Sequence, residues 1–81
     1  MKIDTLVLGP FQVNCYVLFW DDGHGAALVD PGDDAARIIR VVGDRSVSHI
    51  FLTHAHIDHI GAVAELQRRY SAQVVMDERE L

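Results

Sequence analysis

Short apolar runs separated by turn residues fill the first thirty positions, and this pattern predicts three β-strands. The expected strands cover residues 1–8, 13–20 and 26–30. Gly9-Pro10 ends the first strand, and a polar turn at residues 21–25 joins the second strand to the third as a hairpin. Pro31-Gly32 ends the third strand. The chain is therefore expected to open with three consecutive strands.

Helical spacing of apolar residues begins after residue 34. The residues that share this spacing are Ala35, Ile38, Ile39 and Val42. Asp33 or Asp34 supplies the N-cap, and Gly43 closes the helix as a residue that accepts positive φ. A helix is therefore expected between these two caps.

A strand, a helix and a strand follow, and they complete the predicted fold. The expected elements are a buried strand at 48–53, an amphipathic helix at 61–70 and a strand at 72–76. Val63, Leu66 and Tyr70 lie on the inward face of that helix. Residues 77–81 have the pattern of a third helix that is cut off. We expect an α/β (α+β) fold of order βββαβαβ, in a single, C-terminally incomplete domain over residues 1–81.

Composition and charge narrow the function classes. The formal charge of −5 argues against nucleic acid as a partner, because phosphate binding requires clustered Lys and Arg. No apolar run approaches membrane-spanning length and no leader pattern opens the chain, so we expect no membrane partner and a cytoplasmic location. The single cysteine, Cys15, rules out an internal disulfide and is expected to be a core residue. The oligomeric state stays open.

The candidate chemistry is concentrated where the predicted strand 48–53 turns into the next helix. Three imidazoles and one carboxylate, from His54, His56, Asp58 and His59, occur within six positions. These are donors that zinc and other borderline divalent ions accept. In an extended segment His54 and His56 point the same way, about 6.5 Å apart, which suits chelation of one ion. Asp58 and His59 can reach a second ion or support the first.

The motif His54-x-His56-x-Asp58-His59 resembles the signature of the metallo-β-lactamase fold hydrolases. Three further segments agree with that family in order and spacing: Asn14-Cys15-Tyr16, Leu28-Val29-Asp30-Pro31-Gly32 and Leu52-Thr53. The combination is most similar to the hydroxyacylglutathione hydrolase (type II glyoxalase) branch.

The resemblance implies a four-layer αββα sandwich, of which this chain would supply about the first half. It implies two divalent metal ions, with zinc favoured and iron or manganese left open. His54 and His56 would bind the first ion, and Asp58 and His59 the second. A metal-bridging hydroxide, oriented by Asp58 as the catalytic residue, would attack a small-molecule acyl thioester such as a hydroxyacylglutathione.

Asp30 and Thr53 are candidate supporting residues with two open interpretations. Asp30 can be a turn residue before Pro31-Gly32, where Asp is common for backbone reasons. It can instead be a carboxylate that hydrogen-bonds a ligand imidazole and fixes its tautomer. The resemblance slightly favours the second interpretation, and more weakly the same supporting role for Thr53.

The family pattern also requires a later histidine for each ion and a bridging aspartate, and none can be assigned in these 81 residues. His24 and His49 are expected to be surface residues too distant to substitute. We therefore expect the chain alone to be inactive. The alternatives are a non-catalytic metal-binding or interaction fragment, or an enzyme of the same superfamily that acts on a lactone, a lactam or a persulfide.

Overall fold

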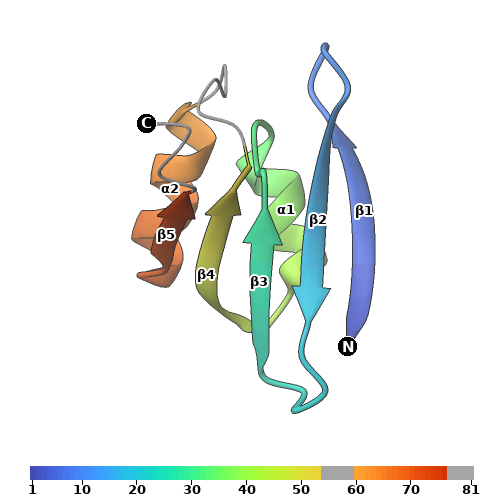
Figure 1. The fold of residues 1–81 in the computed structure, drawn as a ribbon, viewed down its shortest axis with the longest axis vertical. Helices are drawn as coiled ribbons and strands as arrows, with labels where there is room; N and C mark the ends of the chain where they lie inside the picture. Colours follow the sequence, from blue (N-terminus) through green and yellow to red (C-terminus); the bar gives the residue numbers. More distant parts are fainter. Residues whose placement is uncertain (54–59, 77–81) are drawn as a thin grey trace.

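The three predicted N-terminal strands form an antiparallel meander in the computed structural model, which describes residues 1–53 and 60–76 (Figure 1). The strands are β1 (Lys2–Leu8), β2 (Val13–Phe19) and β3 (Gly25–Val29). β1 pairs with β2 over its whole length, from Lys2 opposite Phe19 to Leu8 opposite Val13. The expected hairpin between β2 and β3 is confirmed, because these strands also pair antiparallel.

Two crossovers then extend the sheet with parallel strands. Helix α1 (Ala35–Val42) leads to β4 (Ser46–Leu52), and α2 (Ile60–Tyr70) leads to β5 (Gln73–Met76). β4 is parallel to β3 and β5 is parallel to β4, so the strand order is β1-β2-β3-β4-β5. Parallel neighbours need such long connections, because the chain must return to the same end of the sheet. The predicted element order is therefore confirmed in the described residues.

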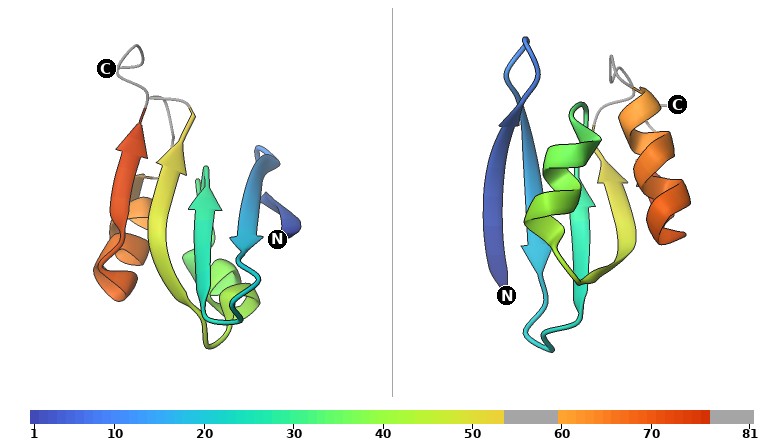
Figure 2. Two further views of the ribbon diagram at one scale, coloured as in Figure 1. Left: turned by 60° about the horizontal axis from the view of Figure 1, so that its bottom comes forward. Right: turned by 180° about the vertical axis from the view of Figure 1, so that it is seen from behind.

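Both helices cover the same face of the sheet, as the view from behind shows (Figure 2). The core lies between this face and the helices. Its fully buried members include Leu8, Val17, Leu28, Ile38, Ile50 and Leu66. Val63 and Leu66 of α2 are buried and Tyr70 packs against the core, as the helical spacing predicts. Alternation along each strand provides this apolar face, since every second side chain points to it.

The opposite face of the sheet, called here the outer face, is not covered by any helix in the described part of the chain (Figure 1). Side chains that alternate with the core positions lie on it. Ile3, Val7, Tyr16 and Val75 are exposed there. No helix within residues 1–53 and 60–76 is long and apolar enough to cross a membrane.

Helix α1 has both caps that the sequence indicates. Asp34 is the N-cap, and its carboxylate accepts a hydrogen bond from the backbone N–H of Arg37. Gly43 has φ 66°, and its N–H donates to the carbonyl of Ile39. Positive φ costs little at glycine, which explains why the helix ends there. The cut-off helix expected at 77–81 lies outside the described residues.

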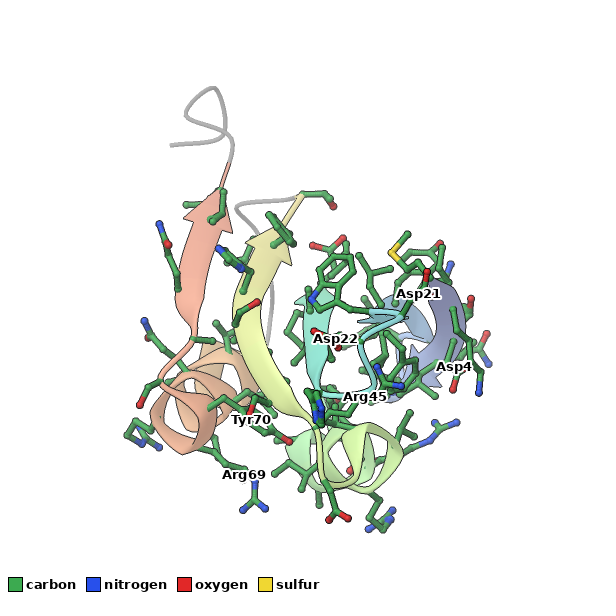
Figure 3. All side chains as sticks on the ribbon, turned by 90° about the horizontal axis from the view of Figure 1, so that it is seen from below. Asp4, Asp21, Asp22, Arg45, Arg69 and Tyr70 are labelled. Carbon is green, nitrogen blue, oxygen red and sulfur yellow. The ribbon has the colours of Figure 1, made fainter. Side chains whose placement is uncertain are left out.

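Arg45 closes the end of the sheet at which β4 begins (Figure 3). Its Nη1 donates to the carbonyls of Trp20 and Gly25, at 2.7 and 3.1 Å, and the guanidinium carbon Cζ lies over the ring of Phe19. In the adjacent turn Asp22 accepts the N–H groups of His24 and Gly25, and these hydrogen bonds lower the pKa of its carboxyl. This end of the sheet is therefore held by hydrogen bonds of its own, away from the candidate metal centre.

Candidate metal centre

The candidate centre belongs to the edge of the sheet where the parallel strands β3 and β4 end side by side (Figure 1). Their last paired residues are Val29 and Phe51. The N–H of Asp30 then donates to the carbonyl of Phe51 at 2.9 Å, which extends the ladder by one bond. In α/β sheets ligands bind beyond the carboxyl ends of the strands, because loops from neighbouring strands converge there.

Asp30 has a left-handed backbone conformation, with φ 54°. This conformation turns the chain out of the sheet toward the buried Pro31, and Asp is among the few non-glycine residues that adopt it readily. The turn leaves the Asp30 carboxylate facing the end of β4. Oδ1 accepts the backbone N–H of Thr53 at 2.7 Å, and Oδ2 accepts the Thr53 hydroxyl in a short hydrogen bond. The Asp30 carboxylate therefore binds both the backbone and the side chain of Thr53, the residue that follows β4.

The four predicted ligands, His54, His56, Asp58 and His59, lie outside the described residues. Their assignment, and the assignment of Asp58 as catalytic, therefore stay predictions. The structure does describe the residues on either side, Thr53 and the start of α2 at Ile60. Within residues 1–53 and 60–76 no group of three or more His, Cys, Asp or Glu side chains is placed to hold a metal ion.

His24, His49 and Cys15 are the other candidate donor residues of the described part of the chain. His24 is exposed in the β2–β3 turn, as expected. His49 is only half-exposed, because its ring stacks on Phe51 with ring centroids 5.7 Å apart and its Nδ1 lies 2.8 Å from the hydroxyl oxygen of Ser48. Cys15 is fully buried in the core, as predicted. Burial, assisted by the negative charge of Asp30, raises the pKa of its thiol to about 12. A protonated, buried thiol is a poor metal ligand.

Neither interpretation of Asp30 included its contact with Thr53. The positive φ agrees with a turn residue, and the contact gives the carboxylate a partner next to the predicted ligands. An additional hydrogen bond that Asp30 would accept from the N–H of a ligand imidazole stays a prediction. The sequence contains one hint of this contact, because Asp30 and Thr53 each follow an apolar run. The contact could be predicted from that hint only if β3 and β4 were known to be parallel neighbours, and the spacing of residues within either segment does not show this.

A second contact that the sequence did not indicate joins the β1–β2 turn to the loop before α1. A Cβ added to Gly9, which has φ 69°, would lie 2.2 Å from Oδ2 of Asp33, so only glycine fits there without displacement. Nη1 of Arg37 donates to the carbonyl of Val7 at 2.7 Å. Arg37 therefore ties α1 to the end of β1, and the β1–β2 turn lies close to the loop before α1 at Gly9.

Comparison with known proteins identifies the class of protein to which this fold and this edge of the sheet belong. The metallo-beta-lactamase superfamily domain matches residues 8–81. The chain therefore belongs to the metallo-beta-lactamase superfamily.

Particular members of the superfamily are similar over most of the chain. Hydroxyacylglutathione hydrolase GloC of Haemophilus influenzae is 37% identical over 76 residues, which are 91% of this chain and 35% of GloC. Among solved structures, BLEG-1 B3 metallo-beta-lactamase has a TM-score of 0.86 and 40% identity, covering 98% of this chain and 38% of that protein. ETHE1 from Myxococcus xanthus has a TM-score of 0.80 and 30% identity, covering 91% of this chain and 34% of that protein.

The chain spans little more than a third of the length of these proteins, whereas the resemblance implied about the first half of the sandwich. The mixed α/β fold is confirmed by the two solved structures.

Proposed function

We propose that this chain provides the metal-binding turn of a metal-dependent hydrolase that acts on a small-molecule acyl thioester such as a hydroxyacylglutathione. One observation carries the proposal. The sequence His54-x-His56-x-Asp58-His59 follows directly after β4 in a member of the metallo-beta-lactamase superfamily that is similar to a hydroxyacylglutathione hydrolase. The remainder of a whole protein's site, and hence its substrate, is part of the proposal.

The donor chemistry fits a borderline divalent ion. Three imidazoles and one carboxylate suit zinc, iron or manganese, and zinc is our first choice. The fully buried Cys15, with its raised pKa, leaves the nitrogen and oxygen donors as the available set. His54 and His56 would hold one ion, and Asp58 and His59 a second. When bound, such ions lower the pKa of water and polarise an acyl carbonyl.

The chain's own residues have two further tasks in this proposal. Asp58 would orient the attacking water by accepting its hydrogen bond, which is the reason for naming it as the catalytic residue. Asp30 and Thr53 would support the ligands from the edge of the sheet, through the contacts described above. The acidic character of the chain agrees with a small-molecule substrate and with the absence of a nucleic-acid partner.

The test assays thioester hydrolysis by the product of the full reading frame that encodes this chain, with and without His56→Ala. We expect turnover that His56→Ala abolishes, and His24→Ala, a histidine at the other end of the sheet, should leave the rate unchanged. Turnover that is insensitive to His56→Ala would refute the mechanism. The 81-residue chain assayed alone is expected to show no turnover, since two protein ligands per ion fall short of the three typical of catalytic zinc.

A lactam is the second candidate substrate, and the similarity to BLEG-1 B3 metallo-beta-lactamase favours it. Thioester and lactam hydrolysis both begin with attack of water on an acyl carbon, so one centre can perform either reaction. The two candidates separate when the same preparation is assayed with a glutathione thioester and with a β-lactam. Hydrolysis of the β-lactam alone would replace the thioester as the proposed substrate.

A non-catalytic role is the third candidate. It is favoured by the small share of the relatives' length that the chain spans. In that case the 81 residues bind metal without turnover, and the product of the full reading frame also lacks turnover. Measurable hydrolysis by either product would exclude this candidate.

A further inference from the structure

The outer face of the sheet carries a row of apolar and aromatic side chains that crosses from strand to strand (Figure 1). The strand pairing places Tyr16 of β2 opposite Val29 of β3. Phe51 of β4 continues the row from Val29, and Val75 of β5 ends it. These positions alternate with the core positions of their strands, so their side chains point away from the helices. The row therefore spans β2 to β5 on the side of the sheet that no described helix covers.

A second row lies beside the first. Leu18 of β2 is opposite Ile3 of β1 on one side and Ala27 of β3 on the other. His49 of β4 follows Ala27 in the row. Its imidazole stacks on the ring of Phe51, and this contact joins the two rows. The two rows together are called here the outer-face patch. Contiguous exposed apolar patches are rare on soluble monomers and mark interaction surfaces.

The chain keeps its formal charges off this face. The charged residues within strands β1 to β5 are Lys2 and Asp4, and both belong to β1. Lys2 lies over the ring of the core residue Phe19, and its Nζ is 3.8 Å from Oδ1 of Asp4, so this pair belongs to the helix side of the sheet. A sheet face that stays in water normally carries polar and charged side chains. In a chain that is 23% charged, a face without formal charge indicates burial against a partner.

We infer that the outer-face patch is an interface between two copies of this chain, packed sheet against sheet. In a two-fold dimer the same patch faces itself, so a charge on it would meet a like charge. The patch avoids this repulsion, although the chain has a formal net charge of −5. Two copies also have the same sheet twist, which permits the aligned packing of β-sandwiches, with the sheets about 10 Å apart. The inference does not depend on the metal centre.

The size of the face sets the strength of the dimer. Five strands about 4.8 Å apart, with about five residues each, give a face of about 24 Å by 16 Å. Its projected area is about 400 Å², and its accessible area is larger because side chains project from it. Stable interfaces bury about 800 Å² of accessible surface per partner. Val7 lies at the rim, on the edge strand β1 and opposite the polar Asn14. We therefore expect a dissociation constant in the micromolar range.

Tyr16→Lys and Tyr16→Glu test the interface as a pair. Tyr16 is exposed in the single chain, so the monomer can accept either charge there. Sedimentation velocity of the 81-residue chain, from about 1 µM to 1 mM, measures the mass. We expect the wild type to change from one copy to two as concentration rises. Each variant alone should weaken the dimer by about 10-fold or more, because like charges would face each other, and an equimolar mixture of the two should restore it.

The matched control is a second pair, Ala36→Lys and Ala36→Glu. Ala36 is exposed on α1, which covers the other face of the sheet, so these variants change the charge equally but away from the patch. They should dimerise like the wild type. A further measurement needs no substitution: labelling of His49 and His24 by diethyl pyrocarbonate, followed by mass spectrometry. His49 should become protected as concentration rises, whereas His24, exposed in the β2–β3 turn, should be labelled equally throughout.

A wild-type chain that stays monomeric up to about 1 mM would overturn the inference and assign the face to another occupant, such as a further segment of the full reading frame's product. A dimer that both Tyr16 variants leave intact would also overturn it, because the copies would then associate through the edge strands β1 or β5. Circular dichroism reports whether the Tyr16 variants are folded. If they are not, the labelling decides, and protection of neither histidine, or of both equally, refutes the inference.

Discussion

The pKa of the Cys15 thiol is determined by the surroundings of this side chain in the core. Its thiol is fully buried between β2 and the helices, and burial is the main reason that its pKa is raised from 9.0 to about 12. The negative charge of Asp30 adds to the shift. The thiolate is unfavourable in the folded chain but not in the unfolded chain, so deprotonation favours unfolding.

This linkage predicts the stability of the chain in alkaline solution. Above pH 9 the unfolded thiol loses its proton while the folded thiol keeps it, so the folded state binds more protons and stability falls as pH rises. The contribution is complete below pH 9 and is lost toward pH 12, by at most about 1.4 kcal/mol per pH unit. Urea unfolding from pH 8 to 11 measures it. The slope should be shallower in Cys15→Ala, and equal slopes would contradict the burial of this thiol.

Residue identities predicted some local roles and missed others. The core role of Cys15 and a cap on α1 from Asp33 or Asp34 follow from composition and from neighbours in the sequence, so they could be predicted, and the structure shows that Asp34 is the cap. The contact between Asp30 and Thr53 joins residues 23 positions apart. It exists because β3 and β4 are parallel neighbours, which is a property of the sheet and not of either segment.

Helix α1 is the element whose ends are best defined by the sequence. Asp34 caps its first turn, although its backbone has φ 50°, a conformation that most residues avoid. The side chain therefore has two effects, since it accepts the N–H of Arg37 and it tolerates the left-handed conformation.

Asp34→Ala should consequently destabilise the chain by about 1–2 kcal/mol, through loss of the cap and through alanine's poor tolerance of positive φ. Asp34→Asn should retain most of the stability, because asparagine caps helices and adopts this conformation. Chemical denaturation of both variants and of Asp44→Ala, which removes an exposed carboxylate beyond the helix, checks the prediction. A loss in Asp34→Asn as large as that in Asp34→Ala would contradict it.

Periodicity predicted the types of all the elements within the described residues, and their bounds to within about two residues. β4 begins at Ser46 rather than at residue 48. A register irregularity between Ala26 and Ala27 places Val47 opposite one residue and His49 opposite the next. This irregularity depends on cross-strand packing, and the alternation of residues in β4 alone could not show it.

At the scale of the whole molecule, one face of the sheet contains the core and the outer face exposes apolar side chains. Val17 and Val7 make a matched pair across these faces: Val17 is fully buried, whereas Val7 is 47% exposed. Val17→Ala should destabilise the chain by about 2 kcal/mol, because it removes buried apolar groups from a packed core. Val7→Ala should cost less than about 1 kcal/mol. Equal losses in urea unfolding would mean that the outer face of the 81-residue chain is packed as tightly as the inner one.

The central claim is that the segment beginning at His54 binds a divalent ion at the edge of the sheet where Asp30 holds Thr53. Zinc binding to the folded state should raise the unfolding free energy, by about 2.7 kcal/mol at a zinc concentration of 100 times Kd. The most direct test is urea unfolding of the 81-residue chain with and without zinc, for the wild type, His56→Ala and His24→Ala. We predict stabilisation of the wild type and of His24→Ala, and little or none of His56→Ala. Equal stabilisation of all three chains, or of none, would contradict the claim.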